Sequence, residues 1–451
     1  MLLDMEDSIF RFISYALNEQ TGEISLKYQL DDIEFFEHLT VPVDGIDFNT
    51  VNRQALDNAL FSLHLMGGVS YWKTKCSKKI VVESGVLCQE QAMFWNEIYT
   101  QGLGEFFYEN KIDFRGLVQF PFTKGCIKPS VEGDQSTKRD VLLPIGGGKD
   151  SIVTAESLKT MKVPFSLFVV KDAAPIRQVG DKIGGDRIVV SREISKTLIE
   201  LNKNPDIYNG HVPITAYLSF LSLVVAILYK KTDVVFSLER SANEGNLSYL
   251  GVEINHQYSK SLEFEIRLQE YVKEFVSNQV SIFSLIRPLS EFHIVKLFTE
   301  YPEHFSLFSS CNRNFTFENT SIGKKTFWCQ TCPKCAFIFV MLCAWLPHKT
   351  VVSIVGADLF ENEELKDLFR ALLGIEGNKP FECVGEAKEV AAAFELCNQR
   401  GDALDSVMMK LYVREARPSF TDSDAVIEEL LQPSTEHVVP DFFKPIFDTW
   451  R

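Results

Sequence analysis

The sequence predicts an α/β protein with a parallel central sheet, because short apolar strands alternate with helical segments from residue 140 onward. The expected strands are 141–145, 164–170, 186–191 and 233–237. Their apolar residues are continuous, which is typical of strands that helices cover on both faces. Ligands of such sheets bind beyond the carboxyl ends of the strands, so the residues that follow each strand are candidates for function.

The segments between these strands have helical character. Residues 151–161 follow the first strand, 176–184 follow the second, and a long helix precedes the fourth. The run 212–229 carries no charge over 18 residues, which just meets the length of a membrane-spanning helix. Pro213 at its start and the immediate passage into strand 233–237 favour a buried helix instead, so we expect no membrane insertion.

Two changes in composition divide the chain into three expected domains. A polar stretch at 129–139 precedes the first apolar strand, and the chain becomes acidic and helical after about Val355. We therefore expect an N-terminal α+β accessory domain at 1–135, a catalytic parallel-sheet domain at 136–355 and a helical C-terminal lobe at 356–451. The first of these shows no residue with recognisable chemistry.

Charge and cysteine content exclude several classes of protein. The 451 residues include 46 Lys and Arg against 61 Asp and Glu, for a formal charge of −15. A protein this acidic lacks the broad basic face of a non-specific nucleic-acid binder, so we expect no nucleic-acid partner. Ten cysteines without regular spacing, and Asp4, Glu6 and Asp7 where a secretory signal would be basic, favour a reduced, cytoplasmic protein.

A glycine-rich loop directly follows the first strand. Glycines let the backbone approach a ligand closely, and the N–H groups at the start of the next helix favour phosphate. The loop is no Walker-type P-loop, because Leu143 stands where its first glycine would be and Ser does not directly follow Lys149. A strand-to-helix turn without a ligand is the alternative. The candidate phosphate-binding residues are Gly146, Gly147, Gly148, Lys149, Asp150 and Ser151.

The run GGGKDS resembles the SGGxDS loop of the ATP pyrophosphatase (PP-loop) superfamily, whose fold is adenine nucleotide alpha-hydrolase-like. That resemblance implies cleavage of ATP to AMP and diphosphate while a substrate is adenylated. It implies further that Lys149 neutralises the phosphates and that Val169 and Val170, at the end of the second strand, lie near the adenine. Gly146 stands where most members have Ser, which removes one hydroxyl contact to phosphate.

Three cysteines form a C-x2-C-x2-C cluster, namely Cys329, Cys332 and Cys335, and Cys311 is the obvious fourth ligand. Thiolates at this spacing suit a tetrahedral structural zinc site, although an iron–sulfur cluster uses similar spacing. Reduced thiols at a helix start are the alternative without a metal. The layout is similar to the zinc site of the 7-cyano-7-deazaguanine synthases, another PP-loop family.

Many hydrogen-bonding side chains follow the strand 233–237. Arg240, His256 and Lys260 could meet phosphates or carboxylates, and Glu244 could hold magnesium or transfer a proton. A polar loop that leads into an amphipathic helix is the alternative interpretation. His256 and Lys260 lie four residues apart, so both project from one face if Asn255 opens the following helix.

Six motifs, in chain order, resemble the UDP-N-acetyl-α-D-muramoyl-L-alanyl-L-glutamate epimerase family (MurL type) over about residues 140–400: GGGKDS, NGHVPITA, SANEGN, NHQYSKSLEFE, the SSCNRNF–WCQTCPKC pair and KPFECVGE. The resemblance implies an isomerase that inverts the terminal L-Glu of a UDP-MurNAc dipeptide to D-Glu for peptidoglycan biosynthesis. It also implies dependence on ATP and Mg²⁺, with release of AMP and diphosphate.

The implied reaction assigns roles to the polar residues. Adenylation neutralises the carboxylate, so that a base can remove the neighbouring α-proton. His256 suits the role of base, because its reference pKa is about 6.5, whereas Lys260 suits binding of the carboxyl group or a diphosphate oxygen. Glu244 is the next candidate for the base.

Two other functions are alternatives. One is a PP-loop ligase or amidating enzyme of the 7-cyano-7-deazaguanine synthase type, which needs ammonia or an amine and leaves stereochemistry untouched. The other is a metal-stabilised binding module that binds nucleotide without turnover.

Overall fold

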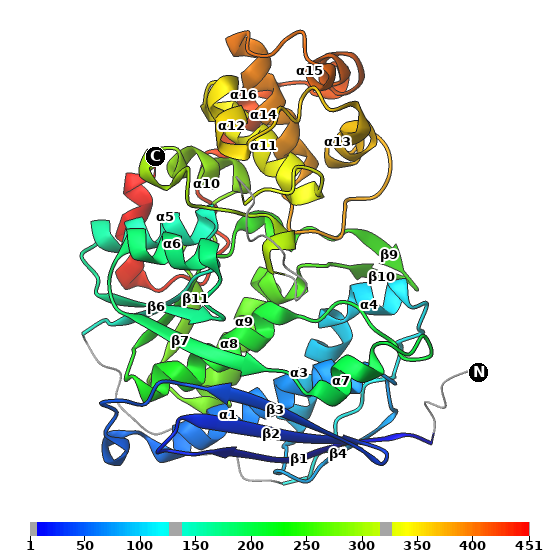
Figure 1. The fold of residues 1–451 in the computed structure, drawn as a ribbon, viewed down its shortest axis with the longest axis vertical. Helices are drawn as coiled ribbons and strands as arrows, with labels where there is room; N and C mark the ends of the chain where they lie inside the picture. Colours follow the sequence, from blue (N-terminus) through cyan, green and yellow to red (C-terminus); the bar gives the residue numbers. More distant parts are fainter. Residues whose placement is uncertain (1–6, 126–137, 316–326, 451) are drawn as a thin grey trace.

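The computed structural model describes residues 7–125, 138–315 and 327–450. Its main sheet has nine strands in the order β11-β8-β5-β6-β7-β3-β2-β1-β4 (Figure 1). A separate hairpin pairs β9 (Leu247–Tyr249) with β10 (Val252–Ile254). The strands of the main sheet are β1 (Ile9–Leu17), β2 (Glu23–Leu30), β3 (Ile33–Thr40), β4 (Lys79–Val82), β5 (Val141–Pro144), β6 (Phe165–Val170), β7 (Arg187–Glu193), β8 (Asp233–Phe236) and β11 (Ser281–Ser284).

Five neighbouring strands are parallel and form the expected α/β core. β5 lies at its centre, with β6 and then β7 on one side and β8 and then β11 on the other. Numbered along the chain, these strands have the order 3-2-1-4-5, so the direction of winding reverses between β5 and β8. This reversal is the topological switch point, where α/β sheets bind their ligands. The prediction of a parallel sheet with these four strands is confirmed, and β11 adds a fifth.

Helices cover both faces of this core, which explains why its strands are apolar throughout. Leu143 of β5 packs in one core with α5 (Lys149–Thr160) and α6 (Ala174–Ile183). The adjacent Leu142 points into a second core with α8 (Ile214–Leu228). The side chains alternate between the faces, so both sets must be apolar.

The apolar run 212–229 forms the buried helix α8, as expected. It packs between the sheet and α1 (Arg53–Gly67) of the N-terminal region. Among the described residues, no helix has the length and apolar character that a membrane crossing requires.

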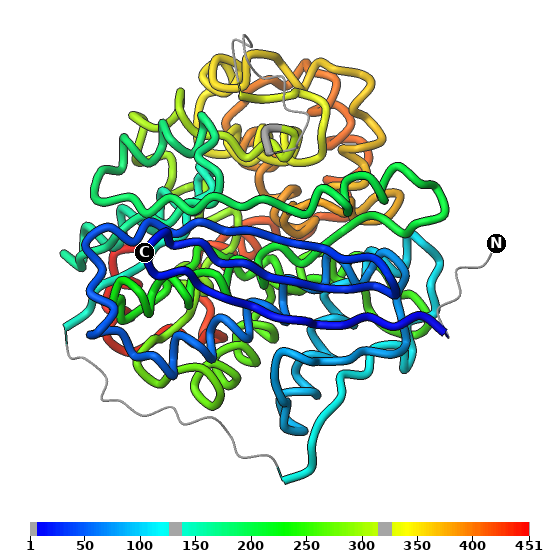
Figure 2. Tube along the Cα trace, turned by 60° about the horizontal axis from the view of Figure 1, so that its bottom comes forward, coloured from blue at the N-terminus to red at the C-terminus, as the bar shows by residue number. Residues whose placement is uncertain are grey.

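The N-terminal region continues the central sheet. β3 pairs antiparallel with β7 from His38–Glu193 to Thr40–Ser191, and β1, β2 and β4 extend the sheet outward. Figure 2 shows these blue strands side by side, away from the yellow and orange helices of the C-terminal region. The expected domain border at 135/136 lies outside the described residues. The domain limits therefore stay predictions.

The rest of the helices pack in three places: in the core of the N-terminal region, against the parallel core, where α10 contacts α5 and α9 contacts β11, and at the end of the molecule opposite the N-terminal strands (Figure 1). α11 packs against α14, and α14 packs against α16. The last residues return to the parallel core, where Phe443 lies against Phe283 of β11. These helices are α2 (Val69–Trp72), α3 (Gln89–Gly102), α4 (Gly104–Glu109), α7 (Lys196–Leu201), α9 (Leu262–Tyr271), α10 (Glu291–Phe298), α11 (Pro333–Trp345), α12 (His348–Val355), α13 (Lys366–Leu372), α14 (Ala387–Arg400), α15 (Val407–Leu411) and α16 (Ser423–Leu430).

A buried carboxylate joins the N-terminal strands to the parallel core. Glu37 of β3 has no exposed surface and accepts hydrogen bonds from Tyr71 Oη (2.7 Å) and Tyr217 Oη (2.6 Å). Arg192 Nε of β7 donates a third, at 2.8 Å, and forms an ion pair with it. Residues of α2, β7 and α8 thus hydrogen-bond the Glu37 carboxylate at the junction between the N-terminal strands and the parallel core.

We predict that Glu37→Ala lowers the free energy of unfolding by about 3 kcal/mol, because Arg192 would lose its buried partner. Urea unfolding measures the change. The matched control is Glu34→Ala in the same strand, where Glu34 pairs with Lys27 at the surface and should contribute less than about 1 kcal/mol. Equal losses in the two variants would contradict a role for Glu37 in holding the sheet together.

Candidate active site

The glycine loop lies at the switch point, between β5 and the start of α5. Gly147 has a φ of +75°, and a Cβ there would lie 3.1 Å from the backbone of Ile176, so the position suits glycine alone. At Gly146, no described atom lies within 4 Å of where a Cβ would be. Ser151 Oγ donates to Gly148 O at 2.9 Å within the first turn of the helix. The loop thus leaves open backbone at a helix N-terminus, as a phosphate requires.

Lys149 of this loop is the first residue of α5, and its side chain is fully buried in a network of charges. It forms ion pairs with Asp150 and with Glu291 of α10, and Lys334 Nζ of α11 lies 3.3 Å from the other Glu291 oxygen. Burial alone would raise the pKa of Glu291, but the two lysines lower it. Burial alone would lower the pKa of Lys149, but Asp150 and Glu291 raise it. Lys149 and Glu291 are therefore both charged at neutral pH.

The residues that follow β8 lie on the other side of the switch point. Glu239 is buried, and its pKa is raised by burial and then by the charge of Glu291. Arg287 fixes two loops there, since it donates to the backbone oxygens of Glu239 and Lys260, both at 2.6 Å. The buried Nη2 atom of Arg240 has no hydrogen-bond partner among the described residues. An orphaned guanidinium nitrogen after a central strand fits an anionic ligand.

The prediction that His256 and Lys260 share a helix face is wrong. Helix α9 begins only at Leu262, because Ser261 caps it by accepting a hydrogen bond from Phe264 N at 3.1 Å. His256 therefore lies in the loop after β10, and Lys260 ends a short 3-10 turn. Despite this difference, both side chains lie beside a third residue, which was not among the predicted site residues.

That third residue is Cys383, which precedes α14. Lys260 Nζ lies 2.9 Å from Cys383 Sγ, and His256 also forms a hydrogen bond with this thiol. Lys334 donates to the Cys383 backbone oxygen. The signal in the sequence was the KPFECVGE run, which contributed to the family resemblance without a role for its cysteine.

Two further residues from distant segments complete this group. Glu105 of α4 forms an ion pair with His256 Nδ1, and His211 Nδ1 lies 3.1 Å from the same Glu105 oxygen. The pKa of His211 is lowered to about 4 by burial and then by the charge of His256. The N-terminal region, for which we expected no recognisable chemistry, thus places a carboxylate beside His256.

Three other predicted residues lie apart from these contacts. Glu244 forms an exposed ion pair with Lys379 at 2.8 Å. Val169 is buried in the core of the sheet, and Val170 is partly buried at the end of β6. Their predicted roles, in magnesium or proton chemistry and beside the adenine, stay predictions.

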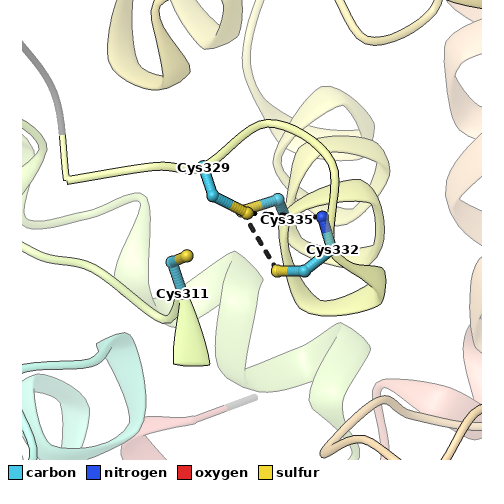
Figure 3. Close-up of side chains that lie close together, drawn as sticks. All are labelled: Cys311, Cys329, Cys332 and Cys335. Carbon is cyan, nitrogen blue, oxygen red and sulfur yellow. Dashed lines mark hydrogen bonds between the residues drawn. The ribbon is translucent and has the colours of Figure 1, made fainter. Parts of the chain in front are cut away.

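Four cysteines converge at the start of α11 (Figure 3), and the sulfur atoms of all four lie within 4.8 Å of one another. Cys335 Sγ is 3.7 Å from Cys329 Sγ and 3.5 Å from Cys332 Sγ. Tetrahedral zinc with Zn–S bonds of about 2.3 Å places its sulfurs about 3.8 Å apart, so the group suits this metal. Cys311 supplies the fourth sulfur from a separate segment, as expected.

The cysteine group lies against the glycine loop. Ser309 N, two residues before Cys311, donates to Gly147 O at 3.1 Å. Lys334, between Cys332 and Cys335, reaches Glu291, the partner of Lys149. The segment before Cys311 thus contacts the glycine loop directly, and the start of α11 is linked to it through Glu291.

Comparisons with known proteins identify relatives along nearly the whole chain. Residues 4–285 match the model of the MurL N-terminal domain, and residues 307–426 match that of the MurL C-terminal domain. Three curated relatives are named UDP-N-acetyl-alpha-D-muramoyl-L-alanyl-L-glutamate epimerase. The protein of Xanthomonas oryzae pv. oryzae is 34% identical over 96% of this chain and 95% of its own length. Those of a Micromonospora species and of Salinispora tropica are 34% and 31% identical, again over 96% of this chain, and over 96% and 93% of their own lengths.

We predict that the freshly purified protein contains about one zinc ion per chain, because four thiolates complete a structural site. Elemental analysis measures it. Cys335→Ser should lose the metal and lower the unfolding temperature, whereas Cys343→Ser, on the same helix but outside the group, should keep the metal. A protein without stoichiometric zinc or iron would contradict the assignment. Iron in place of zinc would indicate an iron–sulfur cluster at the four cysteines.

Proposed function

Because the chain belongs to the MurL family, we propose that it inverts the terminal L-Glu of UDP-MurNAc-L-Ala-L-Glu to D-Glu in an ATP-dependent reaction of peptidoglycan biosynthesis. The observation that carries this proposal is the similarity to three named epimerases over 96% of the chain. The cluster of buried charges at the switch point supports it, since a doubly wound sheet binds its ligands there.

The chemistry explains why the reaction would consume ATP. An α-proton beside a carboxylate is weakly acidic, because its removal would add a second negative charge next to the first. Adenylation of the carboxylate removes that charge, so that an enolate can form. We therefore propose an acyl-adenylate intermediate, with AMP and diphosphate as the other products.

The glycine loop is the proposed site for the ATP phosphates. Residues Gly146–Ser151 would bind them through backbone N–H groups, and Lys149 would neutralise charge as diphosphate leaves. The orphaned Arg240 nitrogen supports an anion at this end of the sheet. Mg²⁺, which would shield the phosphates, suits the Asp150 carboxylate. On this proposal the core is a PP-loop fold, and Val169 and Val170 would lie near the adenine.

A second candidate, amidation by a PP-loop ligase, has one feature in its favour. The four cysteines have a layout similar to that of the 7-cyano-7-deazaguanine synthase zinc site. Amidation would lower the product mass by one unit, whereas epimerisation leaves the mass unchanged.

We predict that the purified protein with ATP, Mg²⁺ and UDP-MurNAc-L-Ala-L-Glu forms D-Glu, detected by chiral analysis after acid hydrolysis. Product mass should be unchanged, and AMP should accumulate. Lys149→Met should lower the rate by about 100-fold or more, because it removes a positive charge that stabilises leaving diphosphate.

The control is Lys159→Met, at the exposed end of the same helix, which should retain activity. Folded protein that forms no D-Glu, or that forms it without ATP, would contradict the proposal.

A further inference from the structure

Cys383 lies where three segments of the chain meet. The residue is partly exposed, unlike the fully buried cysteines of the core such as Cys397. Lys260 Nζ is 2.9 Å from its sulfur, and His256 forms a hydrogen bond with it. A thiol that has two cationic partners and some access from outside has the surroundings of a reactive cysteine.

The charges around Cys383 favour the thiolate. Burial alone would raise the pKa of Cys383, but Lys260, His256 and Lys334 outweigh it and lower the pKa to about 6. Burial alone would lower the pKa of His256, but its hydrogen bonds to Cys383 and Glu105 raise it to about 9. At neutral pH the pair is therefore a thiolate and an imidazolium.

Three further titratable groups lie around this pair, namely Glu382, His211 and Glu105. The Glu382 carboxyl is close to Asn312 and has a raised pKa, chiefly because of burial. His211 is neutral near pH 7, as its lowered pKa shows. Glu105, which lies against both histidines, holds the positive charge on His256.

We propose that Cys383 is the catalytic base that removes the α-proton of the terminal L-Glu, with His256 and Lys260 as positioning residues that hold its sulfur as the thiolate. The inference rests on the proposed epimerase function. It moves the base from His256, whose protonated form cannot accept a proton, to the thiolate beside it.

The proposed step balances as a proton transfer. Cys383 Sγ forms an S–H bond as the Cα–H bond breaks, and the electron pair of that bond moves onto the acyl oxygen to give an enolate. A proton from water then adds to the opposite face of Cα. Water cleaves the acyl-adenylate to release AMP, and the thiol returns its proton to solvent.

The test separates proton removal from adenylation. Cys383→Ala, Cys383→Ser and the control Cys397→Ala are assayed with ATP, Mg²⁺ and the UDP-MurNAc dipeptide in deuterated water. We expect both Cys383 variants to lose deuterium incorporation at Cα by about 100-fold or more, while substrate-dependent diphosphate release stays within a few-fold of wild type. Cys397→Ala should retain both activities.

A Cys383→Ala enzyme that incorporates deuterium at the wild-type rate would overturn the inference and leave the epimerase proposal intact. Wild-type protein that neither inverts nor exchanges the α-position would instead overturn the epimerase proposal. The two failures are thus distinguishable.

If the variants misfold or also lose diphosphate release, a measurement on the wild-type protein still tests the inference. Iodoacetamide labelling of Cys383, followed by peptide mass spectrometry across a pH series, reports the thiolate directly. We expect a midpoint near pH 6, whereas Cys397, whose pKa burial raises to about 12, should stay unlabelled. A Cys383 midpoint at or above about 8.5, the value of an ordinary thiol, would overturn the inference.

Discussion

The carboxylate of Glu291 joins the three segments on which the candidate site depends. Glu291 is the first residue of α10, and its carboxylate forms ion pairs with Lys149 of the glycine loop and with Lys334 of the cysteine-bearing helix. Because these three side chains are buried, each charge is stable only while the others are in place. The glycine loop, the cysteine group and the end of the sheet are therefore fixed relative to one another before any ligand arrives.

Buried charged side chains also fix the backbone around the proposed reaction centre. Lys334 also contacts the backbone of Cys383, and Arg287 holds the backbones of Glu239 and Lys260. One set of charges thus supports both proposed steps, adenylation at the glycine loop and proton removal at Cys383. An enzyme that must activate a carboxylate and then deprotonate its neighbour needs the two sites close together.

The sequence predicted the parts of this arrangement that depend on local pattern. Apolar strands followed by GGGKDS located the loop. Cysteine spacing located three of the four sulfurs that converge, and Cys311 was expected as the fourth. The sequence could not reveal the part played by Glu105 or Cys383, because both lie far from His256 in the chain and reach it only through packing of α4 and of the segment before α14. The prediction that His256 and Lys260 share a helix face was wrong, because Ser261 caps α9 and the helix begins only after it.

The central claim is that the substrate carboxylate is adenylated before its α-proton is removed, and isotope transfer tests it most directly. UDP-MurNAc-L-Ala-L-Glu labelled with ¹⁸O in the terminal α-carboxylate is incubated with the protein, ATP and Mg²⁺, and the AMP is analysed by mass spectrometry. Hydrolysis of an acyl-adenylate at its acyl carbon leaves a carboxylate oxygen on the phosphate, so the account predicts AMP that carries ¹⁸O. Unlabelled AMP alongside newly formed D-Glu would contradict it.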